Sequence, residues 1–154
     1  MALLGPRKEL DTLIDFFMNE TATRGVCVSV STGGSGIALD QGEALATVAA
    51  SSSGVAPLGI LLNDMVNLDL TRQHVNQHKD EVQQGSKVTI LNRGEVTTDD
   101  IFGTPSPGDV AYCYASGLVS PTSESATEFT SPTIGRFHSS KDENGYAKVS
   151  VNLP

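Results

Sequence analysis

Near residue 25 the spacing of apolar positions changes. Before that point, four apolar residues repeat with the period of an amphipathic helix: Leu10, Leu13, Ile14 and Phe17. Pro6 suits the first position of such a helix, because the N–H that proline lacks would have no intrahelical partner there. The pattern predicts an N-terminal helix over residues 6–19. Its apolar surface, widened by Phe16, must be buried against its own domain or against a neighbouring chain.

Beyond residue 25 the apolar positions alternate with polar ones, as in half-buried strands. Val26, Val28 and Val30 alternate in this way with Cys27, Ser29 and Ser31. Further strands are predicted at 44–50, 55–62, 87–91, 95–97, 110–114, 134–137 and 147–153. Turns are predicted between them at Asn92-Arg93-Gly94, Ser116-Gly117 and Asn144-Gly145.

Two polar stretches interrupt this pattern. Residues 63–86 have few apolar positions and are too long for an ordinary hairpin loop. We expect them to form a surface excursion that makes contacts outside the domain. Residues 120–132, rich in Ser, Thr and Pro, predict a second exposed loop.

Composition supports a mainly β fold. Gly, Pro, Ser and Thr make up about a third of the 154 residues, which is typical of short strands joined by tight turns. A chain of this length can bury a core without disulfides. We therefore expect a small antiparallel β-barrel or β-tulip-like sandwich with long loops. Residues 1–24 would be an N-terminal helix or arm, and residues 25–154 the β-rich domain.

Charge and hydropathy disfavour several partners. Acidic residues outnumber basic ones 18 to 10, giving a net charge of −8, so binding to nucleic-acid phosphates is unfavourable. Apolar runs such as residues 59–62 are far shorter than a membrane-spanning helix requires. The N-terminus does not have the pattern of a secretory signal. Cys27 and Cys113 are accordingly predicted to be free, buried thiols in a reducing compartment.

Candidate chemical motifs are incomplete. His74 and His78 have the i, i+4 spacing of a helical metal site, but no third ligand is evident, so we expect two solvated histidines. Asp99 and Asp100 would point to opposite faces of a strand, which favours a role in a turn or cap. The glycine-rich residues 32–36 are not followed by the Gly-Lys-Ser/Thr of a phosphate-binding loop. We expect no catalysis, no metal and no cofactor.

An enzymatic alternative comes from size and composition. Trimeric dUTP pyrophosphatases are small all-β proteins of similar length, rich in Gly and Val. Ser51-Ser52-Ser53-Gly54 resembles a fragment of one of their nucleotide-binding motifs, but no Arg precedes it and the other motifs are missing. A nucleotide hydrolase of this type therefore remains an alternative to a non-enzymatic role.

The second half of the chain resembles another family. Its glycine-punctuated strands carry the resemblance: residues 87–96, 107–112, 116–117, 134–137 and 145–151. Residues 61–74, Leu-Leu-Asn-Asp-Met-Val-Asn-Leu-Asp-Leu-Thr-Arg-Gln-His, also look like a segment of phage virion structural proteins. Together these stretches resemble the capsid decoration, or cement, proteins of tailed phages. The resemblance implies a small β-barrel or tulip-like body that binds the outside of an icosahedral shell, with no catalytic residues to carry over.

The expected partners follow from this resemblance and from the chain's apolar and polar segments. They are the major capsid protein and further copies of the chain, as a dimer or trimer, on the outer surface of a virion whose proteins are made in the host cytoplasm. We expect the contacts to be made by Leu13, Phe16, Phe17, Leu68, Leu70 and Arg72. A phage fibre or receptor-binding domain is the remaining alternative.

Overall fold

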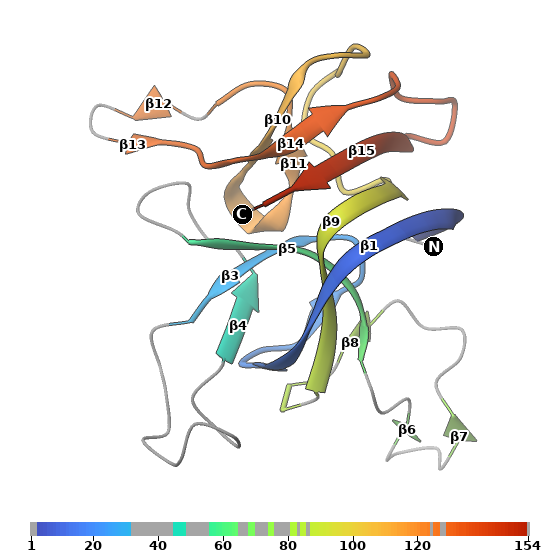
Figure 1. Ribbon diagram of the computed structural model, residues 1–154, viewed down its shortest axis with the longest axis vertical. Coiled ribbons are helices and arrows are strands. Elements are labelled where there is room, and N and C mark those ends of the chain that lie inside the picture. The colour runs from blue at the N-terminus through green and yellow to red at the C-terminus, as the bar shows by residue number, and fades with distance from the viewer. Residues whose placement is uncertain are drawn as a thin grey trace.

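The computed structural model describes residues 3–31, 45–48, 56–64, 68–69, 74–75, 81–82, 84–85, 87–123, 125–126 and 129–153 (Figure 1). Its strands are β1 (Leu3–Met18), β2 (Ala22–Thr23), β3 (Cys27–Val30), β4 (Leu45–Val48), β5 (Pro57–Asp64), β6 (Leu68–Asp69), β7 (His74–Val75), β8 (Glu81–Val82), β9 (Lys87–Thr98), β10 (Val110–Cys113), β11 (Val119–Ser120), β12 (Ser125–Ala126), β13 (Phe129–Thr130), β14 (Thr133–Phe137) and β15 (Ala147–Asn152). A short 3-10 helix, η1, covers Ala115–Gly117. The mainly β prediction is confirmed. Within these ranges, no helix has the length and apolar character to cross a membrane.

One large sheet organises the chain. Its nine strands follow the order β1-β4-β3-β5-β9-β15-β14-β10-β11, and β1 also pairs with β9. This second pairing closes β1, β4, β3, β5 and β9 into a five-stranded barrel. The remaining strands continue from β9 and form a layer beside the barrel, which we call the upper layer (Figure 1). The expectation of a small β-barrel is therefore confirmed.

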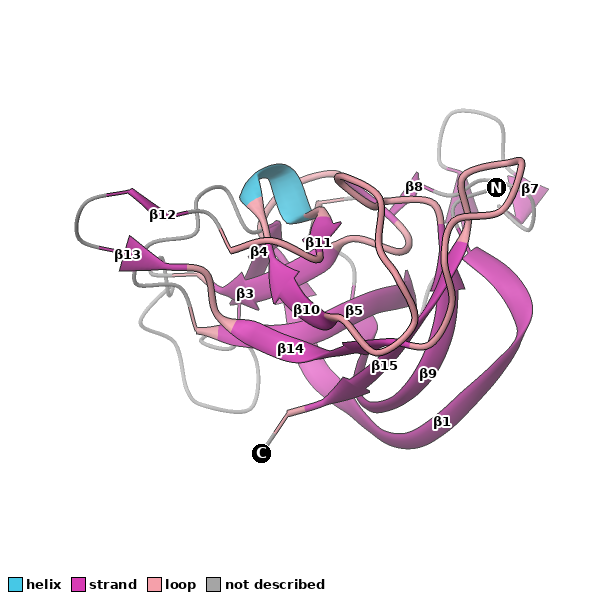
Figure 2. Ribbon diagram, turned by 90° about the horizontal axis from the view of Figure 1, so that it is seen from above, coloured by secondary structure: helices cyan, strands magenta, loops and turns pink. Residues whose placement is uncertain are grey.

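The predicted N-terminal helix is wrong, because residues 3–18 form β1. This strand curves along β9 and pairs with it in antiparallel register from Leu3 to Phe17 (Figure 2). Four register shifts interrupt the pairing. Each irregularity of this kind changes which face the next side chain occupies. The apolar spacing of three and four residues in this segment therefore comes from a bulged strand and not from a helix.

The predicted turn at Asn92-Arg93-Gly94 is also wrong, because β9 runs unbroken through it. Gly94 has φ +150°, and a Cβ atom placed there would lie 2.0 Å from the carbonyl oxygen of Lys8. Glycine in a strand often marks such a close approach of another backbone. Here it lets β1 cross β9 where the barrel closes.

Two hydrophobic clusters lie on either side of β3 and β5. The barrel cluster contains Met18, Ala22, Val26, Val28, Ala46, Leu61, Val82, Val88 and Ile90. The interlayer cluster, between the barrel and the upper layer, contains Leu3, Cys27, Ile60, Leu62, Leu91, Val96, Ile101, Ala111, Cys113, Val119, Ile134, Phe137, Ala147, Val149, Val151 and Leu153. The strand predicted at residues 26–31 is confirmed as β3, but its predicted half burial is wrong, since Cys27 and Val28 are buried on opposite faces.

The upper layer follows the sequence pattern more closely. Val149, Val151 and Leu153 are buried together, as their alternation predicts. The hairpin tip before them has Gly145 at φ +88°, and the carboxylate of Asp142 accepts hydrogen bonds from the backbone N–H groups of Asn144 and Tyr146.

The polar segment 63–86 lies largely outside the described residues. β6 pairs with β7 within it. Its end returns to the barrel, because β8 pairs with β2 and the side chain of Val82 is fully buried.

Candidate interaction surface

Polar side chains from four strands form one outward face of the sheet. In the cross-strand register, Lys8 of β1, Glu95 of β9, Ser150 of β15 and Arg136 of β14 make one row. Asp11, Arg93 and Asn152 make a second row beside it. Neighbouring residues on these strands, such as Val96, Val149 and Val151, point the opposite way into the interlayer cluster. The alternation of β9 and β15 thus fixes which residues face outward.

Basic residues gather on this face. Five of the ten Lys and Arg residues lie on it or at its margin, and all five are exposed: Arg7, Lys8, Arg93, Arg136 and Lys148. We call them, with Leu10, the cationic face. Three carboxylates lie among them, Glu9, Asp11 and Glu95. Off this face, the side chains that the structure describes include three basic and seven acidic residues, so acidic residues outnumber basic ones there, whereas basic residues outnumber acidic ones on the face.

The carboxylates neutralise only part of this charge. Glu9 forms an ion pair with Arg7. Oε1 of Glu95 lies 3.0 Å from Nδ1 of His138. Within the described part of the chain, Lys8, Arg93, Arg136 and Lys148 make no ion pair. Their charges remain available to a partner.

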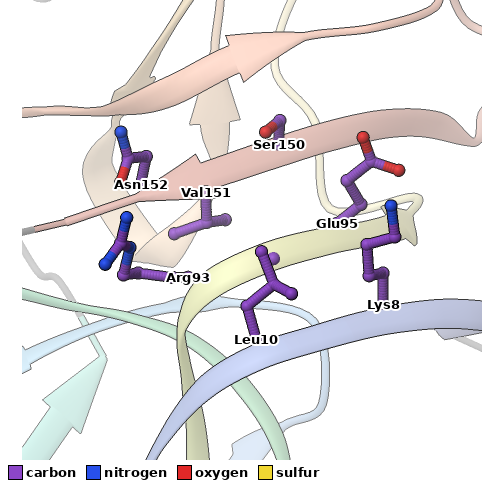
Figure 3. A pocket seen from close by; sticks show the side chains of 8 residues that line it. Lys8, Leu10, Arg93, Glu95, Ser150, Val151 and Asn152 are labelled. Carbon is purple, nitrogen blue, oxygen red and sulfur yellow. The ribbon is translucent and has the colours of Figure 1, made fainter.

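An open groove of about 250 Å³ runs between β1, β9 and β15 in the middle of the face. Figure 3 shows Leu10 standing between Lys8 and Arg93 at its β1 side. The side chain of Leu10 is 73% exposed, and that of Ile14 further along β1 is 47% exposed. Adjoining hollows extend the groove toward Lys148 and toward Arg136. Exposed aliphatic side chains ringed by charges are typical of contact surfaces.

The structure describes the side chains of three of the six residues expected from sequence to contact a partner. Leu13 and Phe16 are partly buried and pack against the barrel cluster. Phe17 is half-buried, and its neighbour across the sheet is Lys87. Leu68 lies in β6, whereas Leu70 and Arg72 fall outside the described residues. That all six contact a partner remains a prediction.

Sequence reasoning missed the cationic face, although one signal for it was present. If Val149, Val151 and Leu153 share the buried side of a strand, then Lys148, Ser150 and Asn152 must share the exposed side. The partners of this row on β9 were hidden by the expectation of a turn at Arg93. The contribution of β1 was hidden by the expectation of a helix.

A second exposed feature lies in the upper layer. Phe102 and Tyr114 stack with ring centroids 4.5 Å apart and ring planes 7° from parallel. Phe102 is 46% exposed. Its backbone N–H donates to the carbonyl of Val119, which holds the stack against β11.

The described residues provide no cluster of three or more His, Cys, Asp or Glu side chains that would hold a metal ion. His74 lies in β7 and His78 outside the described residues. The Asp99–Asp100 pair lies at a turn, where the N–H of Asp100 donates to Oγ1 of Thr98 and the N–H of Ile101 donates to the carbonyl of Asp99. Cys27 and Cys113 are free and buried, as predicted.

The sequence model of one protein family matches nearly the whole chain. The family is described as structural cement protein (E217 gp24/Pam3 gp6), and the match covers residues 8–152. No curated protein matches the chain. The match includes β9, β14 and β15 in full and most of β1, the four strands that carry the cationic face. The chain therefore belongs to the family of phage structural cement proteins.

Proposed function

We propose that the protein binds the outer surface of a bacteriophage icosahedral capsid, where it contacts the major capsid protein. Membership of the cement family establishes the coarser role, a structural protein that stabilises the capsid. The observation that carries the choice of the outer surface is the net charge of −8. A surface of that charge is repelled by packaged DNA inside the shell, whereas the outside imposes no such cost.

Binding of this kind stabilises the shell by mass action. A protein that binds the assembled lattice but not free subunits stabilises it by about 2.7 kcal/mol per site when its concentration is 100 times the dissociation constant. A shell with many equivalent sites multiplies that gain. No chemical reaction is required, which agrees with a family described as structural.

We further propose that copies of the chain associate with one another, as a dimer or trimer, on the virion surface. Linked copies engage neighbouring capsid sites together, so the second contact forms at a high effective concentration. Weak single contacts then add up to stable attachment.

Particles that lack this protein test the proposal. Purified protein added to them is expected to bind in hundreds of copies per particle, to appear as density on the outside of the shell, and to raise the temperature at which DNA is released. A location on the tail, or only a few tens of copies, would instead indicate a fibre or receptor-binding domain. The full chain is needed, because deleting residues 1–18 would remove β1 and open the barrel.

A further inference from the structure

We propose that the cationic face is the surface by which the protein docks on the capsid, and that it receives an acidic segment of the major capsid protein. This inference rests on the proposed function and assigns a surface and a partner chemistry to it. The face spans four adjacent strands and combines unpaired cations, an open groove and the exposed aliphatic side chain of Leu10.

The register of the sheet sets the spacing that a partner must match. Lys8 and Arg136 stand at the two ends of a row that crosses β1, β9, β15 and β14. Strands lie about 4.8 Å apart, so three steps separate the two cations by roughly 14 Å. An extended chain rises about 3.4 Å per residue, and every second side chain lies on the same side. Two carboxylates four residues apart on one extended segment therefore reach both cations.

The charge distribution selects an anionic partner. Among the side chains that the structure describes, seven of the ten carboxylates lie off the cationic face, so an acidic surface is repelled there and attracted at the face. The same distribution orients the protein as it approaches the shell. Attraction of this kind weakens as salt is added.

Protein fits this face better than nucleic acid does. Asp11 and Glu95 stand directly beside Arg93 and Lys8 in the register, so a uniformly negative phosphate backbone would meet carboxylates as well as cations. A polypeptide can place a neutral or basic side chain opposite them. Leu10 adds an exposed aliphatic contact that suits a protein partner.

Three charge reversals in the full chain test the assignment: Lys8→Glu, Arg136→Glu and, as the matched control, Lys87→Glu. All three change the net charge equally, but Lys87 pairs across from Phe17 at the other end of β9, away from the groove. Binding to particles that lack the protein is measured by co-sedimentation at several salt concentrations. The two reversals on the face are expected to weaken binding about tenfold at physiological salt and to reduce its salt dependence. The control is expected to stay within threefold of the unmodified chain. Thermal unfolding of each variant verifies that the fold is intact.

Competition identifies the partner's chemistry. A soluble peptide that carries two Glu residues four positions apart, with neutral residues between them, is expected to displace the unmodified protein from particles, and double-stranded DNA at equal charge concentration is expected to be ineffective. Stronger competition by DNA would overturn the assignment of an acidic protein segment. If the unmodified chain binds and all three variants bind equally well, the cationic face is not the docking surface, although the proposed function stands. If the unmodified chain fails to bind, the proposed function fails and this inference with it.

Discussion

The barrel and the upper layer bury the apolar faces of their strands in different ways. In the barrel, β1 returns to β9, so the five strands close around their own cluster. The upper layer stays open at β11 and buries its inner face on the outside of the barrel, against Cys27, Ile60 and Leu62. The barrel is thus complete without the upper layer, whereas the upper layer needs the barrel to cover its apolar side.

The comparison also shows why the two regions are coupled. β3 and β5 contribute side chains to both clusters, with Val28 and Leu61 on the barrel side and Cys27 and Ile60 on the other. A strand buried on both faces cannot loosen on one side without disturbing the other. We therefore expect the two regions to unfold together.

The largest effect is expected from truncating one core side chain in each region. Phe137→Ala removes the ring of the largest fully buried side chain in the interlayer cluster. Leu61→Ala truncates a fully buried side chain of the barrel cluster. Losses of about 3–5 and 2–5 kcal/mol in the free energy of unfolding are expected, from lost burial and the cavities left behind. Urea unfolding followed by circular dichroism measures both. Each variant should show one cooperative transition shifted to lower urea.

Two separate unfolding transitions in either variant would contradict the coupling of the barrel and the upper layer. If Phe137→Ala melts the upper layer first and leaves a barrel transition at its original midpoint, the shared strands do not couple the clusters. The conservative variant Leu61→Ile, which keeps the side-chain volume, is the control and is expected to cost less than about 1.5 kcal/mol.

The two regions also differ in how far their sequences predict them. In the upper layer, the buried residues of β14, Ile134 and Phe137, lie three positions apart. β10 and β15 alternate cleanly, because each is buried on one face only. Their elements and the burial of Val149 and Val151 follow from local pattern alone. The Gly145 turn follows from local chemistry as well.

The barrel hides its pattern for physical reasons. Register shifts along β1 produce the spacing of a helix, and two-sided burial removes the polar half of the alternation in β3. Gly94 indicates a turn by its residue type, yet its backbone is used for the closure of the barrel. Because the cationic face joins strands from both regions, the local sequence carries a signal for its β15 residues alone. The pairing that adds Lys8 and Arg93 is a property of the tertiary fold.

A smaller effect is expected from glycines that admit no side chain. A Cβ atom at Gly59 in the barrel would lie 1.9 Å from the carbonyl oxygen of Leu91, and one at Gly135 in the upper layer 1.8 Å from that of Ser150. Alanine at either position forces a neighbouring backbone to move, with an expected loss of about 2–4 kcal/mol. Gly59 adds the strain of φ +141°, so the barrel variant should be the less stable of the two. Thermal and urea unfolding measure the difference.

Gly145→Ala is the matched control for these substitutions. Gly145 has φ +88° and nothing within 4 Å of its Cβ position, so its loss, about 1 kcal/mol, reports backbone strain alone. If Ala at Gly59, Gly135 and Gly145 lowers the free energy of unfolding by the same amount, the close approach of neighbouring backbone does not exclude a side chain in either region.

The smallest expected effect concerns the thiols where the two regions meet. Cys27 of β3 and Cys113 of β10 are both buried in the interlayer cluster. A hydrogen bond with Cys113, together with burial, raises the pKa of the Cys27 thiol well above its ordinary value. The folded state therefore keeps Cys27 protonated at pH values where the unfolded chain releases the proton. The resulting stabilisation is fully present below about pH 8.5 and declines as the pH rises toward the folded pKa, by up to about 1.4 kcal/mol per pH unit.

Urea unfolding between pH 7 and pH 10, in a reductant that keeps both thiols free, isolates this contribution by comparing the unmodified chain with Cys27→Ala. The variant has no thiol at position 27 to titrate, so the unmodified chain should lose its advantage in unfolding free energy as the pH rises. Lysine and tyrosine titrations act on both proteins and cancel in the difference. If the unfolding free energies of the two proteins change in parallel up to pH 10, the Cys27 thiol ionises alike in the folded and unfolded chains. The contact between β3 and β10 would then contribute packing alone, and the coupling of barrel and upper layer would rest on the shared strands without a titratable group between them.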